Sequence, residues 1–153
     1  MNTPVLVFYW TESCRVNSAN KGMLVCQMKE NPDDEAEYTI NAIKNNDISE
    51  YALVASLKAK IKDTGEKELL RTAERVFDLF YGWKSFDEKF PLSNPLSKSI
   101  LQNLDVGHMV MTVGDFIIIQ DKVIILKSQD WQIVNRGNCF TKHTADKMSS
   151  ILI

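Results

Sequence analysis

The stretch Thr112–Lys127, T-V-G-D-F-I-I-I-Q-D-K-V-I-I-L-K, decides the fold of this chain. It holds two apolar segments, Phe116–Ile119 and Val123–Lys127, and both are dominated by β-branched residues, which favour strands. A polar break near Asp121-Lys122 separates them, so the stretch predicts a β-hairpin. Asp-Lys is an imperfect two-residue turn, because lysine disfavours the positive φ that glycine would accept.

A third strand is expected at Trp131–Val134, after the polar turn Ser128–Asp130. The three strands would form a β-meander. Because nearly every strand position is apolar, we expect both faces of the meander to be covered. Left exposed, Phe116–Leu126 would be prone to aggregation, so a helix or a second subunit must cover it.

The covering element that we expect is a helix over Glu66–Tyr81. Its apolar residues recur with a period of 3.6, and charged residues occupy the other side. The apolar positions are Leu69, Leu70, Ala73, Val76, Phe77 and Phe80. Trp83–Ser99 contains two prolines and is therefore predicted to be a loop.

The N-terminal part predicts a buried strand at Val5–Trp10, where apolar residues are continuous. A long polar loop, Thr11–Lys21, separates it from a second apolar segment, Met23–Cys26. These two segments would be a hairpin or neighbouring strands.

Residues 33–61 admit more than one interpretation. Asp33 or Asp34 could cap a helix that ends near Ile43. The alternative is a strand at Tyr38–Ile40. Tyr51–Ile61 fits a helical stripe and also fits a strand.

The composition is that of one ordinary globular unit. The chain has 153 residues, of which 44% are hydrophobic and 25% charged, and this balance disfavours disorder. We therefore expect a single α+β domain spanning residues 1–153, with a peripheral tail from about residue 136. Its sheet would be mostly antiparallel, with the β-meander packed against the main helix at about 66–81.

Charge and cysteine content narrow the function classes. The net charge of −2 argues against a strongly basic nucleic-acid binder and against an acidic DNA mimic. Three cysteines, Cys14, Cys26 and Cys139, lack the pattern of a secreted disulfide framework. The N-terminus shows no signal-peptide pattern and the apolar runs are too short to span a bilayer, so we expect a cytoplasmic protein without a membrane partner.

Candidate chemistry is sparse. Cys139 and His143 have a C-x3-H spacing, but two ligands do not make a zinc site. Cys14 lies beside Arg15, which could lower the pKa of its thiol, yet a nucleophile also needs a base such as His108. Phosphate-binding, dinucleotide-binding and hydrolase motifs are absent from the sequence. We therefore assign no catalytic residue, no metal and no cofactor.

Four residues are candidates for a binding surface: Trp131, Asp115, Lys127 and Arg136. Trp131 follows a turn and is the aromatic residue most suited to partial exposure. Asp115 follows Gly114, and such a pair can tighten the start of a strand through positive φ and bonds to nearby amides. The simplest interpretation of Gly114-Asp115 is that it shapes the hairpin.

A family resemblance covers about Tyr51–Val134. The segment His108–Asp115, the hairpin that follows it, and Asp130–Val134 resemble the "R-S-M-S-V-G-D" hairpin of small phage and conjugative-element proteins called YodL-like. Tyr51–Ala59 and the helix through Val76–Phe80 are similar to the strand and helix that precede it there. On this resemblance we prefer a strand at Tyr51.

The resemblance implies a phage or mobile-element accessory protein that works in the host cytoplasm and carries no established catalytic residue. Our leading hypothesis is a module that binds a host protein of a defence or regulatory system. A second is a nucleic-acid-binding domain that uses the meander with Trp131, Lys122, Lys127 and Arg136. A third is an enzyme with Cys14 or Cys139 as nucleophile. Homo-oligomerisation is compatible with all three.

Overall fold

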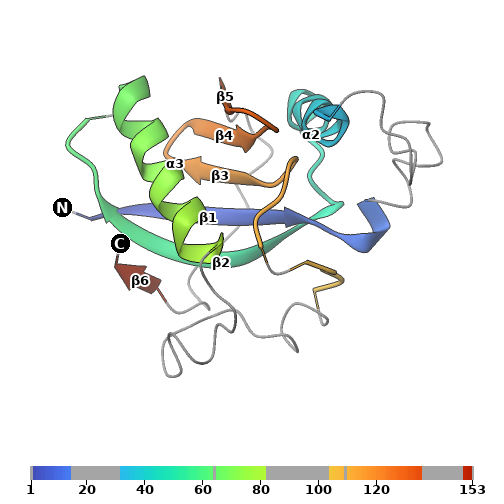
Figure 1. Cartoon of the computed structure of the whole chain (residues 1–153), viewed down its shortest axis with the longest axis horizontal. Helices are drawn as coiled ribbons and strands as arrows, with labels where there is room; N and C mark the ends of the chain where they lie inside the picture. Colours follow the sequence, from blue (N-terminus) through green and yellow to red (C-terminus); the bar gives the residue numbers. More distant parts are fainter. Residues whose placement is uncertain are drawn as a thin grey trace.

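A computed structural model describes residues 2–14, 32–63, 65–81, 104–108, 110–135 and 150–152. The protein has an α+β fold, with one sheet and two main helices (Figure 1). The elements, in chain order, are β1 (Asn2–Trp10), α2 (Asp34–Lys44), β2 (Tyr51–Lys60), α3 (Glu66–Tyr81), β3 (Phe116–Ile119), β4 (Lys122–Leu126), β5 (Trp131–Asn135) and β6 (Ser150–Leu152).

The sheet has the strand order β5-β4-β3-β1-β2-β6. Five strands are antiparallel to their neighbours, and β6 joins β2 in parallel. The first strand therefore lies inside the sheet, between β2 and the hairpin of β3 and β4 (Figure 1). The predicted C-terminal meander is confirmed, and it pairs with the opposite end of the chain.

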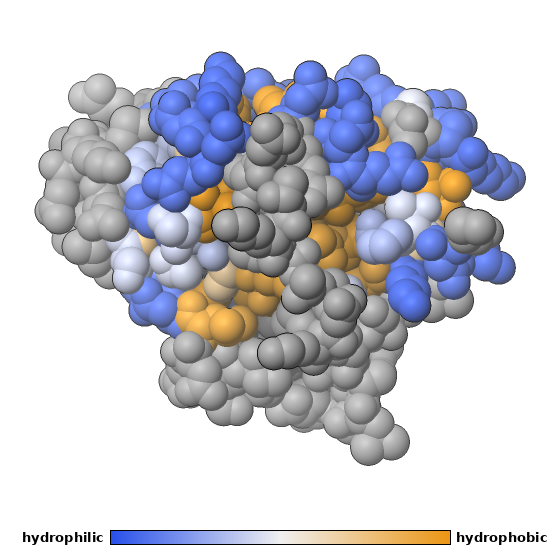
Figure 2. Space-filling view, turned by 180° about the vertical axis from the view of Figure 1, so that it is seen from behind, coloured by the Kyte–Doolittle hydropathy of each residue, from blue (hydrophilic) through white to orange (hydrophobic). Residues whose placement is uncertain are grey.

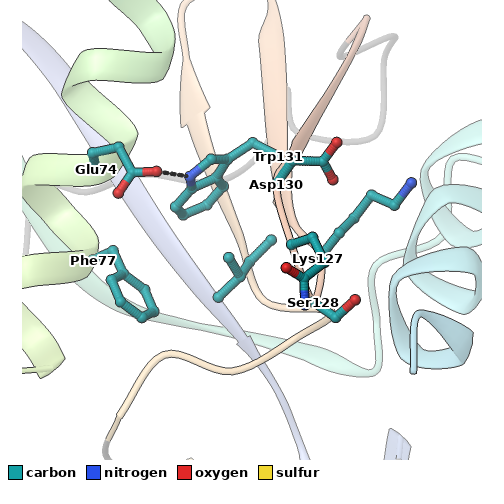
Figure 3. Close-up of a pocket in the computed structure, with 8 residues that line it drawn as sticks. Glu74, Phe77, Lys127, Ser128, Asp130 and Trp131 are labelled. Carbon is teal, nitrogen blue, oxygen red and sulfur yellow. Dashed lines mark hydrogen bonds between the residues drawn. The ribbon is translucent and has the colours of Figure 1, made fainter.

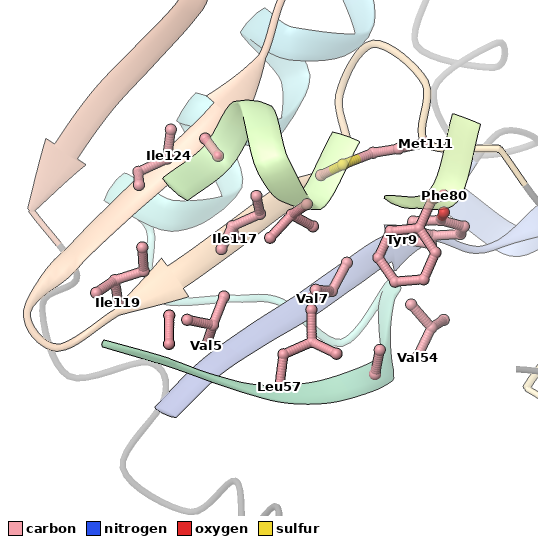
Figure 4. Packing of buried hydrophobic residues seen from close by; sticks show 14 of the residues in the cluster. Val5, Val7, Tyr9, Val54, Leu57, Phe80, Met111, Ile117, Ile119 and Ile124 are labelled. Carbon is pink, nitrogen blue, oxygen red and sulfur yellow. The ribbon is translucent and has the colours of Figure 1, made fainter. Parts of the chain in front are cut away.

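One face of the sheet packs against α3, as the helical periodicity predicts. Leu69, Ala73, Val76 and Phe80 of α3 are at most 1% exposed and belong to one apolar cluster with the sheet. From the strands this cluster takes Val5, Val7, Tyr9, Leu57, Ile117, Ile119 and Ile124, several of which Figure 4 shows beneath the helix. The covering helix is therefore confirmed.

The other face packs against α2. Alternate strand residues point this way because successive side chains in a strand face opposite sides. The second apolar cluster combines Ala36, Ile40 and Ile43 of α2 with Phe8, Phe116, Ile118, Val123 and Ile125 of the strands. Seen from behind, the molecule shows apolar residues among polar ones (Figure 2).

The turn of the hairpin lies one residue earlier than the sequence predicts. Gln120 and Asp121 form it, Gln120 takes the positive φ of 55°, and Lys122 already belongs to β4. The pairing of Ile119 with Lys122 fixes this register. Lys122 also donates to Asn135 Oδ1 at 2.6 Å, which suits a position within the strand.

Residues 33–61 form a helix followed by a strand. The strand considered at Tyr38–Ile40 is wrong, because Ala36, Ile40 and Ile43 are buried together at helical spacing in α2. The strand preferred at Tyr51 is confirmed by β2, which pairs with β1 along its length.

Several predictions lie outside the described residues. They include the strand at Met23–Cys26 and the loop at Trp83–Ser99. The tail from 136 is described only at Ser150–Leu152, where it forms β6.

Replacing Leu69 by alanine should test how firmly α3 holds the sheet. Removing a fully buried leucine costs about 2–5 kcal/mol of unfolding free energy, and we expect a loss in that range. Leu70→Ala is the matched control, because Leu70 is the next residue on the same helix but only half-buried. Urea unfolding of both variants measures the difference, and equal losses would contradict the packing of α3.

Candidate functional site

A small surface pocket lies where α3 faces the turn between β4 and β5 (Figure 3). Its volume is about 120 Å³. It is lined by Glu74, Phe77, Leu126, Lys127, Ser128, Gln129, Asp130 and Trp131. Two of the four residues predicted for binding, Trp131 and Lys127, thus lie in one pocket.

Two elements supply the walls of this pocket. Glu74 and Phe77 are three residues apart on α3 and therefore lie on the same side of the helix. On the sheet side, Leu126 and Trp131 are paired residues of β4 and β5. The connecting turn is closed by a hydrogen bond from the Lys127 amide to the Asp130 carbonyl oxygen, at 2.9 Å.

Trp131 contacts both α3 residues of the pocket, Glu74 and Phe77. Its indole Nε1 donates to Glu74 Oε1 at 2.8 Å, and its ring meets that of Phe77 edge to face, with centroids 6.4 Å apart. The Trp131 side chain is half-buried, as expected from the sequence. A tryptophan ring fixed in this way offers an apolar surface at little further cost in conformational entropy.

The β4–β5 turn is also tied to α2. The Asp33 carboxylate accepts a hydrogen bond from the Ser128 amide at 2.7 Å. This bond lowers the pKa of Asp33 below its ordinary value, and the positive charge of Lys127 adds to the effect. Of the two candidate cap residues, Asp33 stands at the N-cap position of α2, but its side chain makes no cap hydrogen bond and binds the turn instead.

Asp115, the third predicted binding residue, is not at this pocket. Its side chain is fully buried where β3 starts. Oδ1 accepts the Trp10 amide at 3.0 Å, and Oδ2 accepts the Thr112 amide and pairs with His108 Nε2, both at 2.8 Å. Burial raises the pKa of the Asp115 carboxyl, while His108 and the two amides act in the opposite direction.

His108 packs against two aromatic rings, stacked on that of Tyr9 and tilted against that of Trp10. Its ring centroid lies 4.6 Å from that of Tyr9 and 4.2 Å from that of Trp10. Burial, followed by the charge of Asp115, raises the pKa of the Tyr9 hydroxyl. His108 Nε2 binds Asp115, and Nδ1 is buried with no hydrogen-bond partner among the described residues. The imidazole and carboxylate therefore join segments of the fold, which is the structural role considered for Asp115.

Gly114, the residue before Asp115, connects this region to α2. Its φ is +96°, and an added Cβ would lie 2.9 Å from Glu35 Cβ, so α2 approaches too closely for a side chain here. The Gly114 carbonyl oxygen accepts a hydrogen bond from the Thr39 hydroxyl at 2.7 Å. The interpretation that Gly114-Asp115 shapes the hairpin is consistent with this geometry.

Cys14 is buried, with 3% of its surface exposed, and belongs to the apolar cluster on the α2 side. Burial and the neighbouring Cys14 raise the pKa of the Tyr51 hydroxyl, which also shares a hydrogen bond with Thr39 at 2.9 Å. A thiol in this position is packed against the core, whereas a reactive cysteine needs access to solvent or substrate.

The remaining candidate residues lie outside the described ranges: Arg136, Cys26, Cys139 and His143. Within those ranges, no group of three or more His, Cys, Asp or Glu residues could hold a metal ion. No helix in the described part of the chain is long and apolar enough to cross a membrane.

Glu74 and Phe77 cannot be recognised as site residues from the sequence. The helical period predicts Phe77 on the buried side of α3 and Glu74, among several charged residues, on the other side. Neither carries a local signal for a site, because their role depends on how α3 crosses β4 and β5.

Comparison with known proteins identified no relative: no family model, curated protein or solved structure matches this chain. Two features of the structure bear on function: the pocket beside Trp131 and the buried pair of Asp115 and His108. Of the two, the pocket is the one open to a partner.

Asn in place of Asp115 should destabilise the fold strongly. The substitution turns an amide nitrogen towards backbone donors, and leaving a buried hydrogen-bonding group unsatisfied costs about 1–3 kcal/mol. Asp121→Asn, an exposed change in the hairpin turn, should alter the unfolding free energy by less than about 0.5 kcal/mol. Urea unfolding at neutral pH compares them, and similar values for both variants would exclude a structural role for Asp115.

The bond between Asp33 and Ser128 should make stability depend on pH. Because the folded-state pKa of Asp33 is lowered, its carboxylate stabilises the fold above the ordinary aspartate pKa of about 4, and this is lost as the pH falls through the folded-state value. The difference in unfolding free energy between wild type and Asp33→Asn should therefore have its full value at pH 7 and become smaller below about pH 4. Asp34→Asn is the control, and a difference for Asp33→Asn that stays constant down to pH 3 would contradict the assignment.

Proposed function

We propose that this chain is a binding module that acts by occupying the surface of another protein, as an accessory protein of a phage or mobile element in the host cytoplasm. The observation that carries the proposal is the half-buried Trp131, held by Glu74 and Phe77 beside a small pocket. Tryptophan is among the residues that contribute most to binding energy at protein interfaces.

The volume of the pocket favours a protein partner over a small-molecule ligand. Sites for drug-sized ligands usually enclose about 300–1,000 Å³. A pocket of about 120 Å³ is suited instead to one side chain of a partner that also contacts the surrounding surface. The pocket then supplies a specific anchor within a larger interface.

The position of the pocket also suits recognition of an extended segment. It lies at the start of β5, which is the outermost strand on its side of the sheet. Within the described residues β5 pairs with β4 alone. An extended segment can add to such an edge through main-chain hydrogen bonds, while a pocket beside the edge selects one of its side chains.

The two other hypotheses have weaker support. Glu74 and Asp130 place carboxylates beside Trp131, and these would repel the phosphates of a nucleic acid. Lys122, one of the cations proposed for that role, donates to Asn135. Cys14 is buried in an apolar cluster, which is unfavourable for a nucleophile.

Site-specific photo-crosslinking tests the proposal directly. A benzophenone amino acid at Gln129, an exposed residue of the pocket rim, should give a discrete protein adduct in host lysate. The same amino acid at Lys62, an exposed residue in the connection between β2 and α3, is the control and should give none. Mass spectrometry of the adduct identifies the partner.

The adduct at Gln129 should also depend on Trp131. Adding Trp131→Leu should lower its yield at least tenfold, because loss of an interface tryptophan commonly costs 2 kcal/mol or more, which is about a thirtyfold loss in affinity. Equal adducts at Gln129 and Lys62, or a yield that is unchanged by Trp131→Leu, would refute the proposal.

A further inference from the structure

We infer that the pocket receives an arginine side chain of the partner. This inference rests on the proposed function and specifies the chemistry that the pocket selects. Three features point to a guanidinium group: the limited volume, the carboxylate of Glu74 and the aromatic walls supplied by Trp131 and Phe77.

The charges of the pocket are divided between its two sides. Glu74 lies on the α3 side, next to the indole of Trp131 (Figure 3). Lys127 extends away from Trp131 in the same view. The aromatic side of the pocket therefore carries a negative charge and favours a cation.

Glu74 is held in a position where it can bind such a cation. One of its oxygens, Oε1, accepts the bond from Trp131 Nε1, which places this exposed carboxylate at the rim of the pocket. That bond does not engage the second oxygen. A guanidinium group could donate to this oxygen in a charge-assisted hydrogen bond, which is stronger than one between neutral groups.

The aromatic walls favour arginine over lysine. A guanidinium group is planar and weakly hydrated, and it stacks on aromatic rings while it bonds to a carboxylate in its plane. The rings of Trp131 and Phe77 stand nearly perpendicular, at 86°, and so provide walls in two directions. An ammonium group gains cation–π attraction as well, but it loses a stronger hydration shell on entering the pocket.

Chemical-shift titration of the ¹⁵N-labelled full chain tests the inference. The reporter is the Trp131 indole N–H signal, assigned by its disappearance in Trp131→Leu. The probes are the N-acetyl methylamides of arginine, of citrulline, which is its neutral isostere, and of lysine. We expect a saturable shift with the arginine probe, and at least tenfold weaker binding of the citrulline probe.

Two variants distinguish the effect of the Glu74 carboxylate in the pocket from the effect of the overall charge of α3. Glu74→Gln should weaken binding of the arginine probe at least fivefold and bring it close to that of the citrulline probe. Glu66→Gln removes an exposed carboxylate from the start of the same helix and should leave binding within twofold of wild type. The dispersion of the remaining amide signals verifies that each variant is folded.

The outcomes distinguish this inference from the proposed function. Equal responses to arginine and citrulline, an equal or stronger response to lysine, or a response unaffected by Glu74→Gln would overturn the assignment to arginine. If the Gln129 adduct still formed and depended on Trp131, the chain would remain a binding module with a different preferred residue. If arginine bound selectively but no adduct formed, the proposed partner interaction would fail instead.

Discussion

The buried carboxylate of Asp115 is the constraint on which the arrangement of the sheet depends. It binds the last amide of β1, the Thr112 amide and the His108 imidazole, so the end of β1 and the segment before β3 converge on two oxygen atoms. A carboxylate without these partners would be very costly to bury. The adjacent Gly114 lets α2 approach, and its carbonyl oxygen binds Thr39. The start of β3 is thereby fixed relative to both β1 and α2.

The position of the pocket depends on this arrangement of β3, β1 and α2. With β3 paired to β1, the sheet continues through β4 to β5. The helix α3 packs across one face of this sheet. Glu74 and Trp131, 57 residues apart in the sequence, then meet at 2.8 Å. Asp33 ties the adjacent turn to α2 through Ser128, so both helices help to hold one surface feature. The site is thus built from rigid elements, which lowers the entropic cost of binding.

The sequence predicted those parts of the fold that local patterns determine. The period of apolar residues gave α3, and the β-branched runs gave β1 and the meander, because these signals lie within one element. The meeting of Glu74 with Trp131 could not be predicted, since nothing in α3 distinguishes Glu74 from its other charged residues. The Gly114-Asp115 pair predicts a tightened strand start, but the bond of Asp115 to Trp10 spans 105 residues and leaves no local trace in the sequence. The sequence pattern predicts the turn one residue too late, because Gln120, which is not a residue typical of positive φ, takes that conformation.

The interior position of β1 has a consequence for synthesis on the ribosome. β1 pairs with β3, but α2, β2 and α3 lie between them in the sequence, so β1 is synthesised well before its partner. Closing so long a loop is entropically costly and slows folding. Until the hairpin leaves the exit tunnel, one edge of β1 lacks its final neighbour, and the apolar residues Val5, Val7 and Phe8 lack part of their covering. Chaperones should therefore be needed to protect the nascent chain from aggregation. Fragments that stop after α3 should aggregate rather than fold.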